Sequence, residues 1–184
     1  MKIIKTFFDD SVKVIELKKH SDHRGFFYES YNQFKFDNLN LNTRFVQDNL
    51  SFSKKKGVIR GLHFQIPPKS QSKLISVLRG KIADVIVDLR KNSNTYGKYK
   101  KIILDESDPY ILHIPDFFAH GFSVLKDDTL VLYKTNNFYS FDHEKTIIYN
   151  DEILDIDWEI NDENKIISNK DENGMKFNEL KTPF

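Results

Sequence analysis

Short runs of β-branched and aromatic residues, separated by turn residues, recur along most of this chain. Two of them, residues 73–78 and 82–89, flank Arg79-Gly80-Lys81, which is typical of a tight hairpin. Short strands at such close spacing indicate a β-sandwich, a barrel or a jelly roll. The expected strands cover residues 11–17, 26–30, 45–53, 58–64, 73–78, 82–89, 99–104, 110–114, 121–125, 129–133 and 146–149.

Two segments break this pattern. Residues 31–44 are mixed in character and could hold a short helix, and the chain from Asp151 onward is acidic and irregular, with room for a short helix or two. No repeat, low-complexity tract or interdomain linker interrupts the sequence. A length of 184 residues therefore predicts a single domain, 1–184, in which residues 151–184 form a C-terminal tail.

The composition excludes several classes of function. The formal net charge is +1, so no strong field draws the chain to nucleic acid or to a membrane surface. There is no cysteine, which excludes disulfides, thiolate metal ligands and a cysteine nucleophile. The apolar run at the N-terminus is too short for a signal peptide, and no run of about 18 apolar residues exists to span a membrane. We therefore expect a cytoplasmic protein.

Residues 57–73 carry the densest group of polar side chains that could do chemistry. They are Arg60, His63, Gln65 and Lys73, with Pro67-Pro68 ending the expected strand between them. A half-buried strand with a cation and a titratable imidazole favours the wall of a pocket. The alternative is an ordinary sheet strand with one hydrogen-bonded core histidine and one surface arginine, and this stretch alone does not separate the two.

The spacing within this strand carries a geometric prediction. Arg60 and His63 are three positions apart, so regular alternation would put them on opposite faces of the sheet. If both face one pocket, the strand must contain a bulge or a bend, and Gly61 between them lacks the Cβ that would resist one. We therefore predict an irregularity near Gly61, and uninterrupted pairing from Val58 to Gln65 would contradict it.

The other histidines differ in their surroundings. His20 and His23 lie in a polar turn, and His143 lies in a charged one. His113 is flanked by apolar residues, which fits a structural position in a strand. His120 stands between a proline turn and a glycine, at the expected mouth of a strand, where ligands bind in closed β folds.

Two histidine positions match the pattern of a known superfamily. Gly57 followed by His63, and Pro115 followed by His120, resemble the two-part pattern of the cupins, which are small jelly rolls. Metal-binding cupins have a second histidine two residues after the first, whereas this chain has Gln65 there. Because two imidazoles rarely suffice for a metal site, the resemblance is to a cupin without a metal.

A closer resemblance covers nearly the whole chain. Its motifs are Arg-Gly-Phe-Phe-Tyr-Glu (24–29), Gln-Asp-Asn (47–49), Arg-Gly-Leu-His-Phe-Gln (60–65), Pro-Pro (67–68), Gln-Ser-Lys-Leu (71–74), Gly-Lys-Ile-Ala-Asp-Val-Ile-Val-Asp-Leu-Arg (80–90), Ile-Pro-x-x-Phe-Ala-His-Gly-Phe (114–122), Tyr-Lys (133–134), Tyr-Asn-Asp (149–151) and Ser-Asn-Lys-Asp (168–171). Together they resemble the dTDP-4-dehydrorhamnose 3,5-epimerase family. The resemblance implies an all-β cupin jelly roll, or double-stranded β-helix, with a small C-terminal helical tail. It also implies a homodimer in which N-terminal strands cross to the partner.

The resemblance implies an isomerase that needs neither cofactor nor metal. Its substrate is a nucleotide-linked 4-keto sugar used for surface or capsular polysaccharide, and the ketone acidifies the hydrogens on C3 and C5. By resemblance, His63 is the base, Asp171 orients it, Tyr133 returns the proton from the opposite face, and Lys73 stabilises the enolate. Implied substrate contacts are Arg24 from a partner subunit, Glu29, Gln47, Asn49, Arg60 and His120 on the phosphates, Tyr139 stacked on the base, Glu144 and Lys170.

Several of these residues also have ordinary structural interpretations. Tyr133 and Tyr139 fit aromatic positions of any sheet, and the polar surroundings of Lys170 and Asp171 fit a solvated turn. A catalytically silent sugar-binding cupin therefore stays open, as does a metal-dependent cupin oxygenase.

The chain departs from the family pattern at Phe117 and at residues 141–144 and 146–148. We expect these positions around the nucleotide end of the site. The nucleotide therefore stays open between a dTDP-linked 4-keto-6-deoxyhexose and a GDP-linked 4-keto heptose of capsule pathways. An epimerase acting at C3 only and another sugar-nucleotide isomerase are further alternatives.

Overall fold

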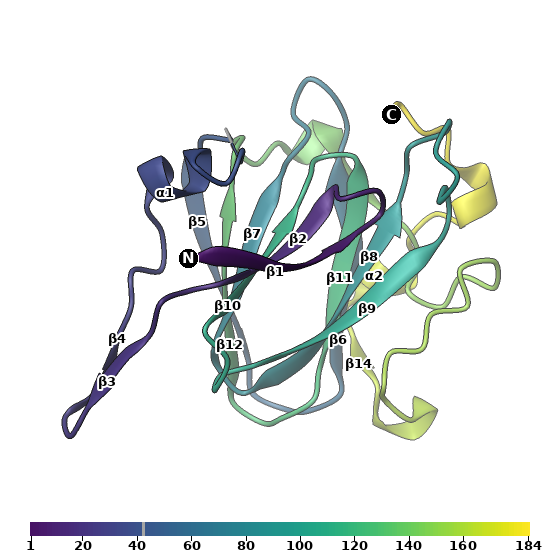
Figure 1. Cartoon of the computed structure of the whole chain (residues 1–184). Coiled ribbons are helices and arrows are strands. Elements are labelled where there is room, and N and C mark those ends of the chain that lie inside the picture. Colours follow the sequence, from purple (N-terminus) through teal and green to yellow (C-terminus); the bar gives the residue numbers. More distant parts are fainter. Residues whose placement is uncertain (42) are drawn as a thin grey trace.

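The computed structural model describes residues 1–41 and 43–184, which build two large, mainly antiparallel sheets packed face to face (Figure 1). The first sheet has the order β1 (Lys2–Phe7), β2 (Val12–Glu16), β10 (Tyr110–Ile114), β7 (Lys73–Arg79), β12 (Thr129–Thr135) and β5 (Gln47–Ser53). The second has the order β13 (Glu144–Thr146), β6 (Val58–Gln65), β11 (Phe118–Val124), β8 (Lys81–Asp88) and β9 (Tyr99–Asp105), with β14 (Ile166–Ile167) also beside β6. The predicted all-β architecture of short strands is confirmed.

Branched side chains from both sheets fill the space between them. Ile82 and Ile86 of β8 belong to one buried cluster with Ile75 of β7 and Val131 of β12. Because β8 lies in one sheet and the other two strands lie in the opposite sheet, this cluster holds the sheets together. Burying each such side chain contributes roughly 1.5–3 kcal/mol.

Irregular segments cover the outer face of each sheet. On the second sheet, Val85 of β8 packs with Trp158 and Phe177 of the C-terminal segment. On the first, Phe36 of the short helix α1 (Gln33–Asp37) packs with Ile15 of β2. β8 is therefore buried on both faces, and every second side chain of β8 faces the interior.

The remaining elements are short. They are the strands β3 (His20–Asp22) and β4 (Gly25–Phe27), the 3-10 turns η1 (Phe141–His143), η2 (Asp162–Asn164) and η3 (Phe177–Glu179), and the helix α2 (Asn169–Glu172). β3 and β4 form a separate hairpin that stands away from the two sheets (Figure 1). Within the described residues, no helix has the length and apolar character needed to cross a membrane.

The structure corrects three details of the sequence-based prediction. β1 is a strand that the sequence pattern did not indicate. β11 begins at Phe118, so His120 lies inside a strand and not at its mouth, because the preceding turn ends earlier than the glycine suggests. The strand expected at 146–149 is β13, which ends at Thr146. The expected helix within 31–44 is confirmed as α1, although residue 42 of that range lies outside the described residues.

The predicted irregularity near Gly61 is confirmed. In the pairing of β6 with β11, His63 faces His120 and Arg60 faces Phe122. From Arg60 to His63 the chain of β6 advances three residues, whereas β11 advances only two between His120 and Phe122. The extra residue in β6 is a bulge. Gly61 has a φ of +124°, a conformation that L side chains rarely adopt.

Gly61→Ala should therefore destabilise the protein strongly. An added Cβ would lie 2.5 Å from the Cα of Gly121 and 2.9 Å from the carbonyl oxygen of His120, and backbone atoms cannot swing aside. Because of this clash and the unfavourable φ, we expect the free energy of unfolding to fall by about 2–4 kcal/mol in urea titrations. Gly25→Ala is the matched control, since Gly25 has a φ of +131° but nothing within 4 Å. Equal losses in both variants would contradict the close approach of the two strands.

Candidate active site

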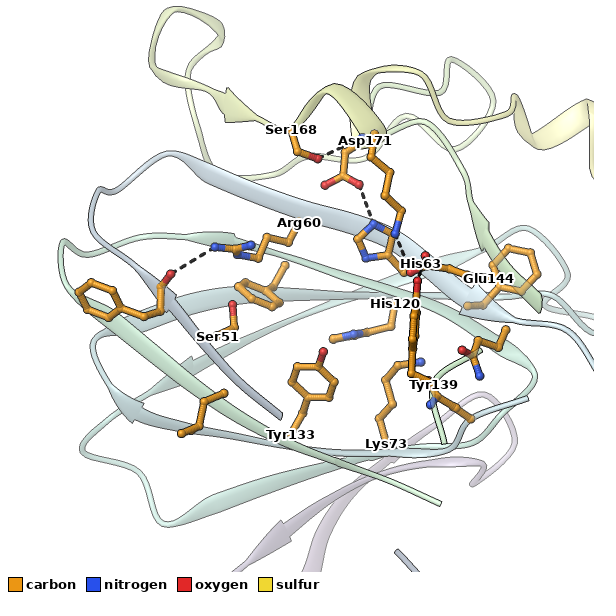
Figure 2. Close-up of a pocket in the computed structure, with 17 residues that line it drawn as sticks. Ser51, Arg60, His63, Lys73, His120, Tyr133, Tyr139, Glu144, Ser168 and Asp171 are labelled. Carbon is orange, nitrogen blue, oxygen red and sulfur yellow. Dashed lines mark hydrogen bonds and ion pairs between the residues drawn. The ribbon is translucent and has the colours of Figure 1, made fainter. Parts of the chain in front are cut away.

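A cavity of about 580 Å³ lies between the two sheets and beside the C-terminal segment (Figure 2). Strands β5, β6, β7, β11 and β12 supply most of its wall, so the site is built on paired strands. The lining residues are Leu50, Ser51, Phe52, Arg60, His63, Phe64, Gln65, Gln71, Lys73, His120, Phe122, Tyr133, Tyr139, Glu144, Ser168, Lys170 and Asp171.

One wall of the cavity holds a histidine–carboxylate pair. His63 Nε2 lies 2.6 Å from Oδ1 of Asp171, a buried residue in the first turn of α2. The side chain of Ser168 caps that turn by accepting from the Asp171 N–H, and the Gly61 N–H donates to Asp171 Oδ2 at 3.3 Å. The bulge that turns His63 into the cavity therefore also supplies a donor for its partner.

The charge of Asp171 decides which nitrogen of His63 can act as a base. Burial alone would raise the pKa of the Asp171 carboxyl, but hydrogen bonds from His63, Gly61 and Ser168 outweigh it, so the pKa lies below its usual value. An ionised Asp171 requires His63 Nε2 to carry a hydrogen, which leaves the lone pair of the neutral ring on Nδ1. Figure 2 shows that second ring nitrogen turned towards the cavity.

The facing wall holds a phenol and an ammonium group. Tyr133 of β12 and Lys73 of β7 rise from the opposite side of the cavity from His63 (Figure 2). Burial raises the pKa of Tyr133, so its hydroxyl keeps its proton. Lys73 is only 7% exposed, and burial lowers its pKa to about 8 although the carboxylates of Asp84, Asp116 and Glu144 act in the other direction. A proton acceptor and a proton donor thus face each other across one space.

The rest of the lining is rich in cations and hydrogen-bonding groups. Arg60 Nη2 donates to the carbonyl oxygen of Phe52 at 3.2 Å, which fixes the guanidinium at one end of the cavity. At the other end, Lys170 Nζ lies 2.6 Å from Glu144, whose other oxygen accepts from the Tyr139 hydroxyl at 3.0 Å. Such a cavity fits a substrate with anionic groups beside a polar ring.

Comparison with known proteins identifies the family. Residues 9–179 match the family model of dTDP-4-dehydrorhamnose 3,5-epimerase. This chain belongs to the dTDP-4-dehydrorhamnose 3,5-epimerase family. A member from Shigella flexneri is 46% identical over 96% of each chain. Members of the family are isomerases, which fits a cavity with a base facing an acid.

Solved structures of the family share this fold. The enzyme from Bacillus anthracis, with TDP and pyrophosphate bound, is 44% identical with a TM-score of 0.91 over 95% of this chain and 98% of that one. The enzyme from Legionella pneumophila, in complex with dTDP-4-keto-L-rhamnose, is 41% identical with a TM-score of 0.90 over 96% of this chain and 93% of that one. The two sheets are therefore the cupin-type jelly roll that the sequence resemblance implied.

Most family positions named from the sequence lie in this cavity. All four residues assigned to the chemistry line it, as do five of the residues assigned to substrate contacts: Arg60, His120, Tyr139, Glu144 and Lys170. Gln47 and Asn49 of β5 stand behind the lining. Gln47 donates to Asn49 Oδ1 at 2.8 Å and accepts from the Tyr139 N–H at 3.0 Å, so it holds the segment that carries Tyr139.

Arg24 and Glu29 lie outside the cavity of their own chain. Arg24 is in the β3–β4 hairpin and pairs with Asp22 at 2.6 Å, and Glu29 pairs with Lys35 of α1. Both side chains are exposed to a large extent. A single chain therefore does not bring these two predicted contacts to the site.

Two departures from the family pattern do not lie where we expected. Phe117 is not part of the lining; its ring packs 5.2 Å from the ring of Phe118 and 5.2 Å from the Arg90 guanidinium. Ile147 is fully buried in the cluster on the outer face of the second sheet. Phe117 lies in the turn before β11 and Ile147 follows the end of β13, and packing outside the cavity accounts for both positions.

The sequence analysis missed Ser51 and Asp84. Ser51 continues the alternation of Gln47 and Asn49 along β5, and that period of two could have found it. Its Oγ is buried and finds no hydrogen-bond partner among the described residues. Asp84 lies in an otherwise apolar strand, where a buried acid requires a partner. Residues 1–41 and 43–184 contain no cluster of three or more His, Asp or Glu side chains able to hold a metal ion.

Lys73→Met should stabilise the fold near neutral pH. The pKa of Lys73 is about 8 in the folded chain against 10.5 for an unburied lysine, so burying the ammonium costs free energy even after the attraction of Asp84, Asp116 and Glu144 is included. That cost is complete below pH 8 and fades as the pH rises towards 10.5, because the unfolded chain then loses its proton too. We expect the free energy of unfolding to increase by about 2–3 kcal/mol at pH 7, with a smaller gain at pH 9.

The exposed Lys98 offers the matched control. Lys98→Met should change the free energy of unfolding by less than about 0.5 kcal/mol at either pH. Urea titrations at pH 7 and pH 9 measure both variants. A Lys73→Met protein that is less stable than the parent at pH 7 would contradict a desolvated ammonium in the cavity.

Proposed function

We propose that this protein is an epimerase that inverts C3 and C5 of a dTDP-linked 4-keto-6-deoxyhexose, without a cofactor. The observation that carries the proposal is the cavity itself, in which the His63–Asp171 pair faces Tyr133 and Lys73. A silent sugar-binding protein would not need a histidine–carboxylate pair aimed at a buried lysine. The dTDP-linked substrates named for the relatives at more than 40% identity support the thymidine nucleotide.

The chemistry follows from the positions of the four side chains. His63 Nδ1 removes the proton next to the ketone, and the electron pair of the broken C–H bond forms an enolate. The Lys73 ammonium stabilises the negative charge on the enolate oxygen, which is worth more in a dry cavity than in water. Tyr133 then donates its proton to the opposite face of the carbon and the ketone reforms, with the configuration inverted. The imidazolium returns its proton to the phenolate through solvent.

The binding groups divide the cavity by charge. Arg60 suits the diphosphate, because its guanidinium presents nitrogen donors at the wall next to His63, and His120 lies in the same part of the lining. Tyr139, 53% exposed at the rim, suits stacking on the base. A GDP-linked 4-keto heptose remains the second candidate, since Phe141, two residues after Tyr139, is 79% exposed and belongs to the segment that departs from the family. Incubating the enzyme with each nucleotide sugar in D2O and counting deuterium at C3 and C5 separates these substrates, and also separates inversion at both carbons from inversion at C3 alone.

Two variants should separate proton removal from proton return. His63→Ala should abolish deuterium uptake at both carbons, because it removes the imidazole that accepts the proton. Tyr133→Phe should keep exchange but slow inversion, because His63 can still form the enolate and return a proton to the same face. Losses of roughly 10²–10⁴-fold are expected for groups of this kind. Tyr96→Phe is the control, since it removes a phenol that packs in the cluster outside the cavity. Near-normal exchange in His63→Ala, or inhibition of the parent enzyme by a chelator, would contradict this mechanism.

The same proposal includes a homodimer that completes the site. Its support is the β3–β4 hairpin, which stands away from the body and exposes Phe26 and Phe27 at 59% and 68%. Arg24 in this hairpin would then reach the cavity of the partner chain. Light scattering at micromolar concentration should give twice the 21.7 kDa of one chain. A monomer mass would contradict both the dimer and the role of Arg24 in a second site.

A further inference from the structure

Asp84 is a buried carboxylate for which the epimerase mechanism above has no use. It lies in β8, faces the interior and is 0% exposed. Its Oδ2 lies 2.8 Å from His120 Nε2, and its Oδ1 is buried without a hydrogen-bond partner among the described residues. An acid in such a place is costly unless charges nearby compensate it.

Two groups of the cavity provide that compensation. Asp84 and Lys73 face the same interior space from opposite sheets. Asp84 shares its face of β8 with Ile82 and Ile86, Lys73 shares its face of β7 with Ile75, and these three isoleucines belong to one buried cluster. Across that space the carboxylate of Asp84 attracts the Lys73 ammonium, as those of Asp116 and Glu144 also do. Burial raises the pKa of the Asp84 carboxyl, and the charges of His120 and Lys73 oppose that rise. Asp116 is tied to Ser70 Oγ at 2.8 Å and Glu144 to Lys170, so neither is committed to Lys73. Asp84 is therefore the acid best placed to balance the buried ammonium.

We propose that Asp84 is a positioning residue of the site, which holds the His120 ring through Nε2 and acts as the buried counter-ion that keeps Lys73 charged. The first effect fixes the tautomer of His120, because a carboxylate can only accept a hydrogen from Nε2. Nδ1 is then the one ring nitrogen left for a ligand. The second effect keeps a full positive charge where the enolate oxygen forms. The catalytic consequence rests on the proposed function, but the contact and the charge do not.

The titration of Lys73 tests the counter-ion directly and without substrate. Acetic anhydride reacts with a neutral amine only. Labelling Lys73 from pH 6 to pH 10 and following its peptide by mass spectrometry therefore gives the Lys73 midpoint, which is the pH at which half of the Lys73 side chains are neutral. Asp84→Asn keeps the shape and the oxygen acceptor for His120 but removes the charge. Because the lost anion favoured the ammonium, the Lys73 midpoint should move down by about 1 pH unit or more.

Asp105→Asn is the matched control for this titration. Asp105 is a carboxylate of the neighbouring strand β9, bound to Ser107 and not among the groups that attract Lys73. It should leave the Lys73 midpoint unchanged. A midpoint in Asp84→Asn equal to that of the parent chain would overturn the counter-ion role.

The pH dependence of the activity provides a second test, which a purely structural role of Asp84 would not affect. The rate needs Lys73 charged, so it falls as the pH rises through the Lys73 midpoint, and in Asp84→Asn that fall should begin at lower pH by the same shift. A parent chain inactive on every 4-keto sugar nucleotide would overturn the proposed function but leave the labelling result standing. If the Asp84→Asn enzyme is active and its rate falls at the same alkaline pH as that of the parent, the inference about Asp84 is overturned but the proposed function is not.

A measurement on the unaltered chain keeps the inference testable if Asp84→Asn does not fold. Nitrogen-15 NMR of histidine-labelled protein, with His120→Asn used to assign the signal, reports which ring nitrogens carry hydrogen. His120 Nε2 should remain protonated from pH 6 to pH 9. A neutral His120 with hydrogen on Nδ1 and none on Nε2 would overturn the proposal, because two acceptors would then face each other at 2.8 Å.

Discussion

The site depends on the bulge at Gly61. A regular strand would turn Arg60 and His63 to opposite faces of the sheet, so no side-chain substitution could bring both into one cavity. The extra residue in β6 corrects that alternation, and the Gly61 N–H it exposes donates to Asp171. The close approach to Gly121 of β11 fixes the bend, because neither glycine has a Cβ to keep the strands apart. One backbone irregularity thus turns His63 into the cavity and helps to hold Asp171.

Charge balance around the cavity is the second constraint on the fold. Lys73 is buried, whereas Arg60 and Lys170 reach solvent, and the carboxylates of Asp84, Glu144 and Asp171 are distributed among these cations. Each buried ion is unfavourable by itself and is tolerated only where a partner of opposite sign lies close. The histidines of the two histidine–carboxylate pairs, at 2.6 Å and 2.8 Å, lie on adjacent strands, where β6 and β11 place His63 opposite His120. The sheets are stable because their apolar cluster is large, which leaves room for a charged site that costs stability.

The parts of the fold that a sequence predicts are those with a local cause. Period-two alternation and the turn at Gly80 located most strands, and the three-residue step from Arg60 to His63 predicted the bulge. The start of β11 was wrong because it depends on pairing with β8, which the local turn residues do not reveal. Asp171 was found through family resemblance alone, since its turn looks solvated and its partner His63 is 108 residues away. Asp84 was missed for the same physical reason: its importance comes from His120 across the sheet, and nothing beside it in the sequence indicates that contact.

The side chains at the centre of the cavity and several positions that depart from the family pattern lie in different parts of the fold. His63, Lys73 and Tyr133 are held by paired strands in the middle of two sheets, where a shift of one side chain would disturb several neighbours. Tyr139 lies instead at the exposed edge of the cavity, Phe141 is exposed two residues further along the chain, and Phe117 and Ile147 pack outside the cavity. Substitutions at Phe141, Phe117 and Ile147 therefore change side chains that the paired strands at the centre of the site do not depend on. The sheets fix the positions of His63, Lys73 and Tyr133, whereas residues 136–143 form a segment between β12 and β13 that the sheets constrain less.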